Sequence, residues 1–351
     1  MTSAAPPPPI GVRNGRLAVF PSRADGASSS CVASEPHVIR GGLRATLVPR
    51  GLRLLEDCGV RAGDAFILVL DNDAVSVACL LASMELKCVC VLLSGGRVSL
   101  LPRVRQQTGL TKVITVSGDT ATVNANVSTT EPPKWLLNEA IQGGGVGLLT
   151  SGSVGAPKVV ACSWKNMLLQ GQCTHEQLFP GQPARIICAT SISHAYSINA
   201  VFTLYTSPAD AASELCFVAD TSALYSLLST QTDKFTLLYG TPATYTRLLE
   251  FPQGRLYADV PYCAGTRLAR ELFEQTQQHN GLMLMQNYGS TETGDIAAWY
   301  LHGLRFPDES PNMASVEEIY VGRLWPGVRV EVEPNGEVLV WTPPAGKLMY
   351  T

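Results

Sequence analysis

Short apolar runs alternate with longer, partly apolar stretches along the first third of the chain. Residues 65–70 and 88–93 are continuous apolar runs, and 112–116 is a third run that is mostly apolar. The stretch 74–84 is long enough for about three helical turns. Continuous apolar runs of this length are typical of strands that are buried on both faces. The pattern predicts a mainly parallel sheet covered by helices, followed by a polar linker at 117–134.

A second series of the same kind follows farther along the chain. Its strands are expected at 184–189 and 234–239, and its helices at 244–249 and 268–278. Near the end the apolar period becomes two, in 328–333 and 338–341, and Asn335-Gly336 lies between these runs. Asn-Gly between two alternating runs is typical of a β-hairpin. We therefore expect an α/β protein whose last part is mostly β.

Composition and charge narrow the range of partners. The chain has 351 residues, of which 46% are hydrophobic and 16% are charged, so a large buried core is expected. Its 26 basic and 29 acidic residues give a net charge of -3, which argues against a nucleic-acid partner or an anionic membrane surface. The most apolar stretch, 74–93, contains Glu85 and Lys87, so no membrane span is predicted.

The N-terminus and the cysteines indicate a reducing compartment. The first residues have no basic region and no apolar region, as a secretory signal would, and the run Pro6 to Pro9 favours a partly disordered leader at 1–41. The 10 cysteines include no Cys-x-x-Cys pair, and Cys88 and Cys90 lack nearby partners for a zinc site. We expect buried free thiols and a cytoplasmic protein.

The segment 147–158 carries the clearest chemistry. An apolar run enters a loop of hydroxyl-bearing and glycine residues that ends at Lys158. Glycines let backbone N–H groups approach a phosphate, and the lysine adds a positive charge. Ser163 is suited to cap a helix that begins at Trp164. A Walker A loop is excluded because Pro157 precedes the lysine. The order of these features, an apolar run, then hydroxyl-bearing residues and glycines, then Pro157-Lys158, also argues against an ordinary surface loop made of turn-forming residues.

Residues 150–158 resemble the phosphate loop of the adenylate-forming superfamily, which includes acyl-CoA synthetases, aryl-acid ligases, luciferases and peptide-synthetase adenylation domains. Two residues depart from the family pattern: Val154 replaces the usual threonine and Val159 replaces the usual glycine. The first change removes a hydroxyl group from the loop. This puts the affinity for ATP in question.

Other segments resemble the family in the expected order. The segment 285–294 resembles its second nucleotide motif, and 191–196 resembles the segment that places a histidine or aromatic residue beside the carboxylate pocket. The segment 262–267 resembles the loop beside adenine, 321–328 a structural turn, and 54–64 the start of the first sheet. The resemblance covers 42–351 and implies two mainly parallel sheets with flanking helices in layers, plus a small distorted β-barrel region. Its subdomains would be 42–170 and 171–310, with the β-rich region at 311–351.

The resemblance also implies roles for individual residues. Tyr288 would stack on adenine, Thr291 would contact the α-phosphate, and Glu292 would hold Mg²⁺. The residues expected to bind ATP are Thr150, Ser151, Gly152, Ser153, Gly155, Lys158, Gly265, Thr266, Asn287, Tyr288, Gly289, Ser290 and Thr291. The expected catalytic residues are Lys158, Thr291, Glu292 and His194. The residues expected to bind the acid are His194, Tyr196 and Gly289.

The implied reaction joins a small carboxylic acid to AMP, at the expense of ATP, as an acyl-adenylate. The acyl group would then pass to CoA or to the phosphopantetheine thiol of an acyl or peptidyl carrier protein. The segment around His194 lacks the acidic residue that holds an α-amino group in amino-acid-activating relatives, so we expect an aryl or medium aliphatic acid.

One part of the family pattern is missing. The family carries a hinge and a catalytic lysine in a small domain after the β region, and this sequence has no lysine after Lys347. We expect the C-terminal small domain to be absent, by truncation or in a natural one-domain relative, and turnover to be impaired. The alternative from another class is a non-catalytic module that binds nucleotide or acyl-adenylate. An ordinary ATPase is disfavoured by the failed Walker A pattern.

Overall fold

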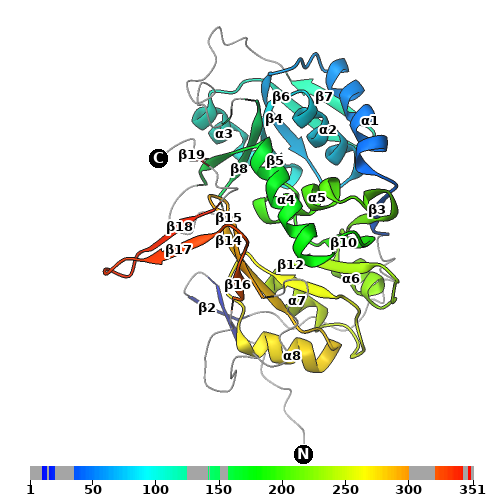
Figure 1. Ribbon diagram of the computed structural model, residues 1–351, viewed down its shortest axis with the longest axis vertical. Coiled ribbons are helices and arrows are strands. Elements are labelled where there is room, and N and C mark those ends of the chain that lie inside the picture. The colour runs from blue at the N-terminus through cyan, green and yellow to red at the C-terminus, as the bar shows by residue number, and fades with distance from the viewer. Residues whose placement is uncertain are drawn as a thin grey trace, which may run out of the picture. The chain divides into compact units, whose positions relative to one another are not determined.

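A computed structural model describes residues 10–13, 16–19, 35–124, 141, 143–150, 157–299, 321–342 and 347–348. The chain divides into two compact units, Met1–Ala33 and Ser34–Thr351. In the first unit, strands β1 (Ile10–Arg13) and β2 (Arg16–Val19) pair antiparallel as a hairpin. The second unit contains both large sheets and every described helix (Figure 1).

The first sheet has seven strands in the order β19-β9-β8-β5-β4-β6-β7. Its strands are β4 (Ala65–Leu70), β5 (Val89–Ser94), β6 (Val113–Ser117), β7 (Thr120–Asn124), β8 (Gly145–Leu149), β9 (Val159–Ser163) and β19 (Lys347–Leu348). Strands β8, β5, β4 and β6 are parallel, whereas β7, β9 and β19 pair antiparallel with their neighbours.

Helices cover both faces of this first sheet. Along β4, Phe66 and Leu68 belong to the core formed with α1 (Leu43–Asp57) and α2 (Ala74–Glu85). The intervening Ile67 packs on the opposite face with residues of η1 (Gly95–Leu100) and α3 (Leu101–Thr108). Successive side chains of a strand point to opposite faces, so the continuous apolar run is explained by burial on both sides.

The second sheet has eight strands in the order β16-β15-β14-β13-β12-β10-β11-β3. Its strands are β3 (His37–Arg40), β10 (Ala184–Cys188), β11 (Glu214–Phe217), β12 (Phe235–Gly240), β13 (Val260–Cys263), β14 (Met285–Ser290), β15 (Gly294–Ala298) and β16 (Arg323–Leu324). Strands β11, β10, β12, β13 and β14 are parallel, and β3, β15 and β16 run antiparallel to their neighbours. Strand β3 lies within the range assigned from the sequence to the leader.

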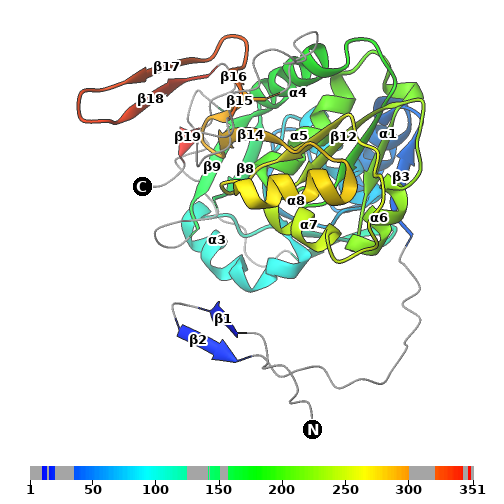
Figure 2. The same ribbon diagram turned by 90° about the horizontal axis from the view of Figure 1, so that it is seen from below.

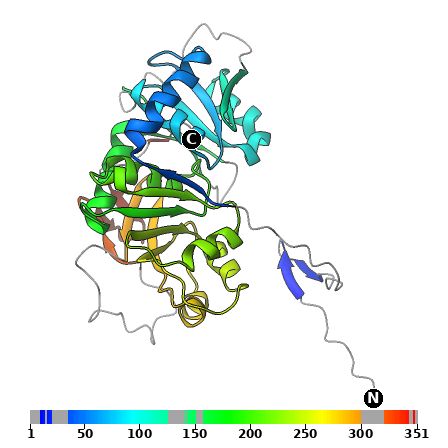
Figure 3. The ribbon, with the colours of Figure 1, turned by 90° about the vertical axis from the view of Figure 1, so that its right-hand side faces the viewer.

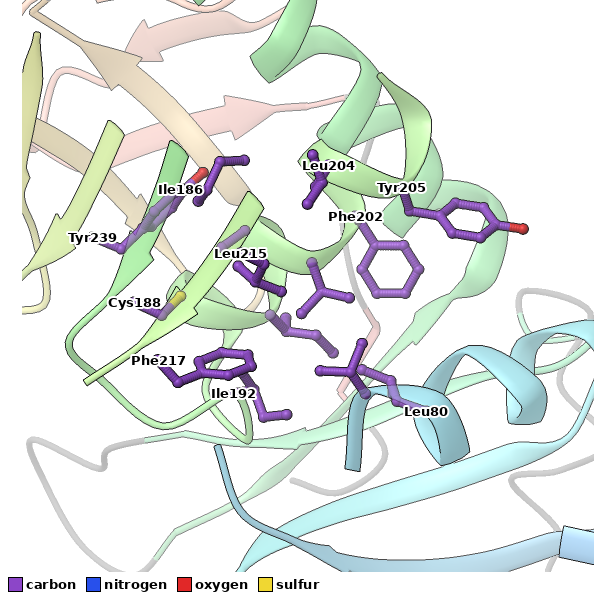
Figure 4. Close-up of a cluster of buried hydrophobic side chains, with 14 of the residues drawn as sticks. Leu80, Ile186, Cys188, Ile192, Phe202, Leu204, Tyr205, Leu215, Phe217 and Tyr239 are labelled. Carbon is purple, nitrogen blue, oxygen red and sulfur yellow. The ribbon is translucent and has the colours of Figure 1, made fainter. Parts of the chain in front are cut away.

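The helices of the second sheet also divide between its faces. Helices α4 (Trp164–Leu178) and α5 (Ala195–Thr206) lie between the two sheets (Figures 1 and 3). Helices α6 (Thr221–Leu228), α7 (Pro242–Leu248) and α8 (Arg270–Asn280) lie together on the outer face (Figure 2). The short helix η4 (Asp210–Ala212) precedes β11. Leu80 of α2 packs in one buried cluster with Ile192 and Phe202, which joins the two layers into a single core (Figure 4).

The structure confirms the expected α/β architecture with two mainly parallel sheets. The predicted linker is wrong in its first part, because Gly118 and Asp119 form a tight turn and β7 pairs with β6. Most side chains of β7 are exposed, so this edge strand carries no continuous apolar signal. None of the helices in the described ranges is long and apolar enough to cross a membrane.

The β-rich tail contains the expected hairpin. Strands β17 (Arg329–Val332) and β18 (Val338–Trp341) pair antiparallel, and Gly336 in their turn has a φ of 84°. The amide N–H of Glu337 donates to the side-chain oxygen of Asn335 at 2.9 Å, which fixes the turn. Strands β16 and β19 extend the two large sheets, and the described residues of this region do not close into a barrel.

Candidate active site

A cavity of about 660 Å³ opens where the two sheets meet. It collects loops that follow strands of both sheets, the place where ligands bind in open α/β sheets. Its lining residues are Leu149, Thr150, Lys158, Gln170, Thr190, Ser191, His194, Ala195, Tyr196, Ser197, Thr241, Ala264, Gly265, Asn287, Gly289, Ser290, Thr291, Glu292, Gly294 and Asp295. Segments that are far apart in the sequence therefore share one cavity.

The two ends of the expected phosphate loop are held together at this cavity. The N–H of Thr150 donates to the carbonyl of Lys158 at 2.9 Å, and the N–H of Lys158 donates back to the Thr150 hydroxyl at 3.1 Å. The side-chain amide of Gln107 donates to the carbonyl of Pro157 at 2.9 Å. These bonds continue the β8–β9 ladder and fix the base of the loop.

The interior of the loop lies outside the described residues. This applies to the expected ligands Ser151, Gly152, Ser153 and Gly155, and also to Val154. Val159, the second departure from the family pattern, is fully buried in β9 and packs in the core beneath α3. Its side chain therefore serves the core of the first sheet.

The second nucleotide motif forms the opposite wall. Strands β14 and β15 form a tight antiparallel pair with a register shift between Tyr288 and Gly289. A Cβ at Gly289 would collide with the carbonyl of Gly294, so this close approach requires glycine. The backbone arrangement places Thr291 and Glu292 at the cavity.

Glu292 presents a carboxylate with no ion-pair partner among the described residues. Those residues also contain no group of three or more His, Cys, Asp or Glu side chains that could hold a metal. A single carboxylate suits Mg²⁺, which takes one or two protein carboxylates and completes its shell with water and substrate phosphates. The donor set therefore fits a metal that arrives with a nucleotide.

Two residues assigned to the nucleotide from the sequence do not line the cavity. Tyr288 is 48% exposed, and Thr266 is exposed on the loop after β13. Their neighbours Asn287, Gly289 and Gly265 do line it. Gly265 has a φ of 89°, which strains any residue that has a Cβ atom.

His194 and Tyr196 lie in the wall formed by the start of α5. The backbone carbonyl of His194 accepts the N–H of Ile198 at 2.9 Å, which begins the helix. Burial and then the charge of Arg97 lower the pKa of His194, so its imidazole is neutral at pH 7. The ring of Tyr196 packs against that of Tyr239 in a tilted arrangement, with 5.0 Å between the ring centroids and 54° between the ring planes.

The loop before α5 is tied to the first sheet by a residue that the sequence did not single out. The side-chain amide of Asn72 donates to the carbonyl of Thr190 at 2.9 Å and accepts the N–H of Ile192 at 2.9 Å. Asn72 follows β4, so the two sheets share this connection beside the cavity.

Sequence analysis also missed Asp295. The carboxylate lines the cavity and accepts the side-chain amides of Asn199 at 3.1 Å and Asn287 at 3.2 Å. Burial raises the pKa of Asp295 to about 6, and hydrogen bonds from Gln170 and Asn287 oppose this shift. An acidic residue at the start of the otherwise apolar strand β15 was the available signal.

Comparisons with known proteins agree with this geometry. Residues 146–350 match the model of a family described as AMP-binding enzyme. Comparison with curated protein sequences gives no match.

Solved structures share the fold. Apo MatB from Rhodopseudomonas palustris has a TM-score of 0.63 and 18% identity, over 86% of this chain and 65% of that chain. O-succinylbenzoate coenzyme A synthetase (MenE) from Bacillus subtilis, in complex with AMP, has a TM-score of 0.67 and 18% identity, over 86% and 65%. The same enzyme in complex with the acyl-adenylate intermediate OSB-AMP has a TM-score of 0.65 and 17% identity, over 87% of this chain and 64% of that chain.

The chain therefore spans less than two thirds of the length of these proteins. The matched family region contains both predicted nucleotide motifs, and it begins in β8 immediately before the phosphate loop. The resemblance seen in the sequence is confirmed, and this chain belongs to the AMP-binding enzyme family.

Proposed function

We propose that this protein activates a small carboxylic acid with ATP and forms an acyl-adenylate. The observation that carries the proposal is the convergence of Lys158, Thr291, Glu292 and His194 on one cavity. These residues come from both sheets, and the family match covers the two motifs that supply three of them. An aryl or medium aliphatic acid fits a cavity of about 660 Å³ together with a nucleotide.

The first step is a displacement at phosphorus. An oxygen of the substrate carboxylate attacks the α-phosphorus of ATP, and the bond from that phosphorus to the bridging oxygen of pyrophosphate breaks. The carboxylate is already ionised at neutral pH, so the protein need not remove a proton. Its task is to align the reactants and to stabilise the charge on the phosphates.

The cavity supplies groups suited to that task. Lys158 offers a positive charge to the phosphate oxygens, and the Thr291 hydroxyl offers a hydrogen bond to the α-phosphate. The neutral imidazole of His194 offers one N–H to the substrate carboxylate. A positively charged imidazole would instead stabilise the carboxylate before the reaction and so raise the barrier to its attack. Glu292 would hold Mg²⁺, which would neutralise phosphate charge when bound.

The second step would transfer the acyl group to a thiol of CoA or of carrier-protein phosphopantetheine. The thiol loses its proton to solvent, its sulfur attacks the acyl carbon, and the bond from that carbon to the phosphate oxygen of AMP breaks, so that AMP leaves. We propose a cytoplasmic location for this chemistry. The nine cysteines in the described part of the chain are all free, which suits a reducing compartment.

Binding and turnover test the proposal separately. Thermal unfolding should shift upward with a 5′-O-(N-acylsulfamoyl)adenosine, a stable mimic of an acyl-adenylate. Lys158→Ala should weaken this shift, whereas Lys165→Ala on the exposed start of α4 should not. No shift with any acyl group at saturating concentration would refute the proposal.

Exchange of labelled pyrophosphate into ATP, dependent on an added acid, tests the chemical step. Binding without exchange for a broad panel of acids would favour the alternative, a non-catalytic module that binds nucleotide or acyl-adenylate. Exchange above the background of Lys158→Ala would establish the enzyme.

A further inference from the structure

The part of the cavity around Asp295 is polar and contains a carboxylate. Asp295 follows Glu292 by three residues in the sequence and pairs with Gly289 in the β14–β15 ladder. Its carboxylate is therefore in the same cavity as the groups assigned to the phosphates, but on the strand that leads away from them. Tyr196, expected from the sequence to contact the acid, lines the same cavity.

The carboxylate has amide partners but no cation. Asn199 and Asn287 each donate one hydrogen bond to it, and Gln170 also hydrogen-bonds it. No Lys or Arg forms an ion pair with it among the described residues. Asp295 is half-buried, and a carboxylate held largely away from water without a counterion is unusual, because desolvation is costly unless the charge is paired. Asp295 lines the cavity, where a bound ligand could supply the missing positive charge.

Two neighbouring polar atoms also lack partners within the described part of the chain. The hydroxyl of Tyr196 and the side-chain oxygen of Asn287 are both buried without a hydrogen bond, and both residues line the cavity. Asn287 is only 4% exposed. Rotating its amide by 180° would turn its oxygen against the Asp295 carboxylate, so the amide orientation is fixed and the free oxygen is an acceptor.

We propose that Asp295, with Asn287 and Tyr196, forms a subsite that selects a carboxylic acid whose acyl part carries a hydrogen-bond donor. The donor is a hydroxyl or a protonated amine, and a protonated amine gains most because it also pairs the buried charge. An apolar acyl group would leave the Tyr196 hydroxyl and the Asn287 oxygen without a hydrogen bond and the Asp295 charge without a counterion, and a second carboxylate would be repelled by Asp295. This inference rests on the proposed function, since it names the acid that the same cavity would activate.

The subsite also revises the substrate expected from the sequence. The segment around His194 contains no acidic residue, which favoured an acid without an amine. Asp295 supplies the acidic group from strand β15. Because β15 is far from His194 in the sequence, the local pattern around His194 does not reveal it. The site would therefore distinguish acids by the polarity of their acyl part.

The test uses benzoyl-sulfamoyl adenosines that differ in one substituent of the ring, placed at the meta or para position. The substituent is ethyl, hydroxymethyl or aminomethyl, which are equal in their number of heavy atoms, or the larger carboxymethyl. Affinity is measured by isothermal titration at pH 8. For at least one position we expect the aminomethyl and hydroxymethyl compounds to bind at least about tenfold more tightly than the ethyl compound. The carboxymethyl compound should bind most weakly. The difference between aminomethyl and hydroxymethyl separates the effect of charge from that of a neutral donor.

Asp295→Asn should abolish the advantage of aminomethyl over ethyl, because it removes the charge that pairs with an ammonium group and that an ethyl group leaves without a counterion. Asp119→Asn, on the exposed β6–β7 turn, removes the same charge outside the cavity and should keep the preference. The wild-type series decides the question even if Asp295→Asn unfolds.

The outcomes distinguish the two proposals. Equal or tighter binding of the ethyl compound at both positions overturns the subsite and leaves the adenylate-forming function standing. A preference for aminomethyl that persists in Asp295→Asn also overturns it. Failure of every compound to bind overturns the proposed function and the subsite with it.

Discussion

Asp295 makes a prediction about stability that does not depend on any ligand. Burial raises its pKa from an ordinary 3.8 to about 6, so the folded state disfavours the ionised carboxylate. The group therefore costs nothing below pH 3.8, and its cost grows as the pH rises through this window. Above about pH 6 the cost is constant, at roughly 3 kcal/mol for a shift of about two units. Water in the cavity reduces this free-energy penalty, so the value given is an upper bound.

Substitution by asparagine removes the ionisation but keeps the shape. The variant also changes the hydrogen bonds with Asn199 and Asn287, because an amide presents one acceptor where the carboxylate presents two. This second effect does not vary with pH. Comparing the two proteins at two pH values therefore cancels it and isolates the ionisation of Asp295.

The assay is urea unfolding of both proteins at pH 5 and at pH 8. The stability of wild type minus that of Asp295→Asn should fall by about 1.5 kcal/mol between pH 5 and pH 8, as the linkage relation gives for pKa values of 3.8 and about 6. Tyr196 and Tyr239 have pKa values raised well above their ordinary values by burial, so they stay neutral in this range. A difference that is independent of pH, or that rises with pH, would refute the reasoning.

Three further predictions concern the walls of the cavity. Glu292→Gln should weaken ATP binding in the presence of Mg²⁺ while leaving the melting temperature unchanged. The control is Glu274→Gln on the exposed face of α8. If titration shows that ATP binding by Glu292→Gln depends on Mg²⁺ as fully as in wild type, Glu292 has no role at the metal. Asn72→Ala should lower the free energy of unfolding by about 1–3 kcal/mol in urea, because it removes both hydrogen bonds to the loop before α5; a loss well under this range would mean that the loop is held by other contacts. Gly289→Ala should destabilise by about 1–3 kcal/mol because its Cβ meets backbone, whereas Gly96→Ala has open space and should be close to neutral; similar unfolding midpoints for both would contradict the packing argument.

The secondary structure of the buried strands could be predicted from the sequence with little error. The run at 65–70 coincides with β4, because burial on both faces demands apolar residues without interruption. The N-cap at Ser163 was also predictable, and its hydroxyl accepts the N–H of Asn166 at 3.2 Å, since capping depends on neighbours in the chain. Strand β7 was missed because an exposed edge strand needs no apolar pattern.

The motif residues were likewise visible in the sequence, because glycines, hydroxyls and a lysine in order have a chemical meaning that does not require the fold. That Thr150, Lys158, Thr291, Glu292 and His194 share a cavity was an expectation from resemblance alone until the two sheets were seen to bring them together.

Only the tertiary structure decided which other side chains join them. Asp295, Asn199 and Asn72 come from three separate segments, and nothing in their immediate neighbours marks them as polar contacts of one site. Local sequence determines backbone preference and burial period, which act over a few residues. The convergence of acceptors around Asp295 depends on the pairing of β14 with β15 and on the packing of α5 against the second sheet, and such long-range contacts are set by the fold as a whole.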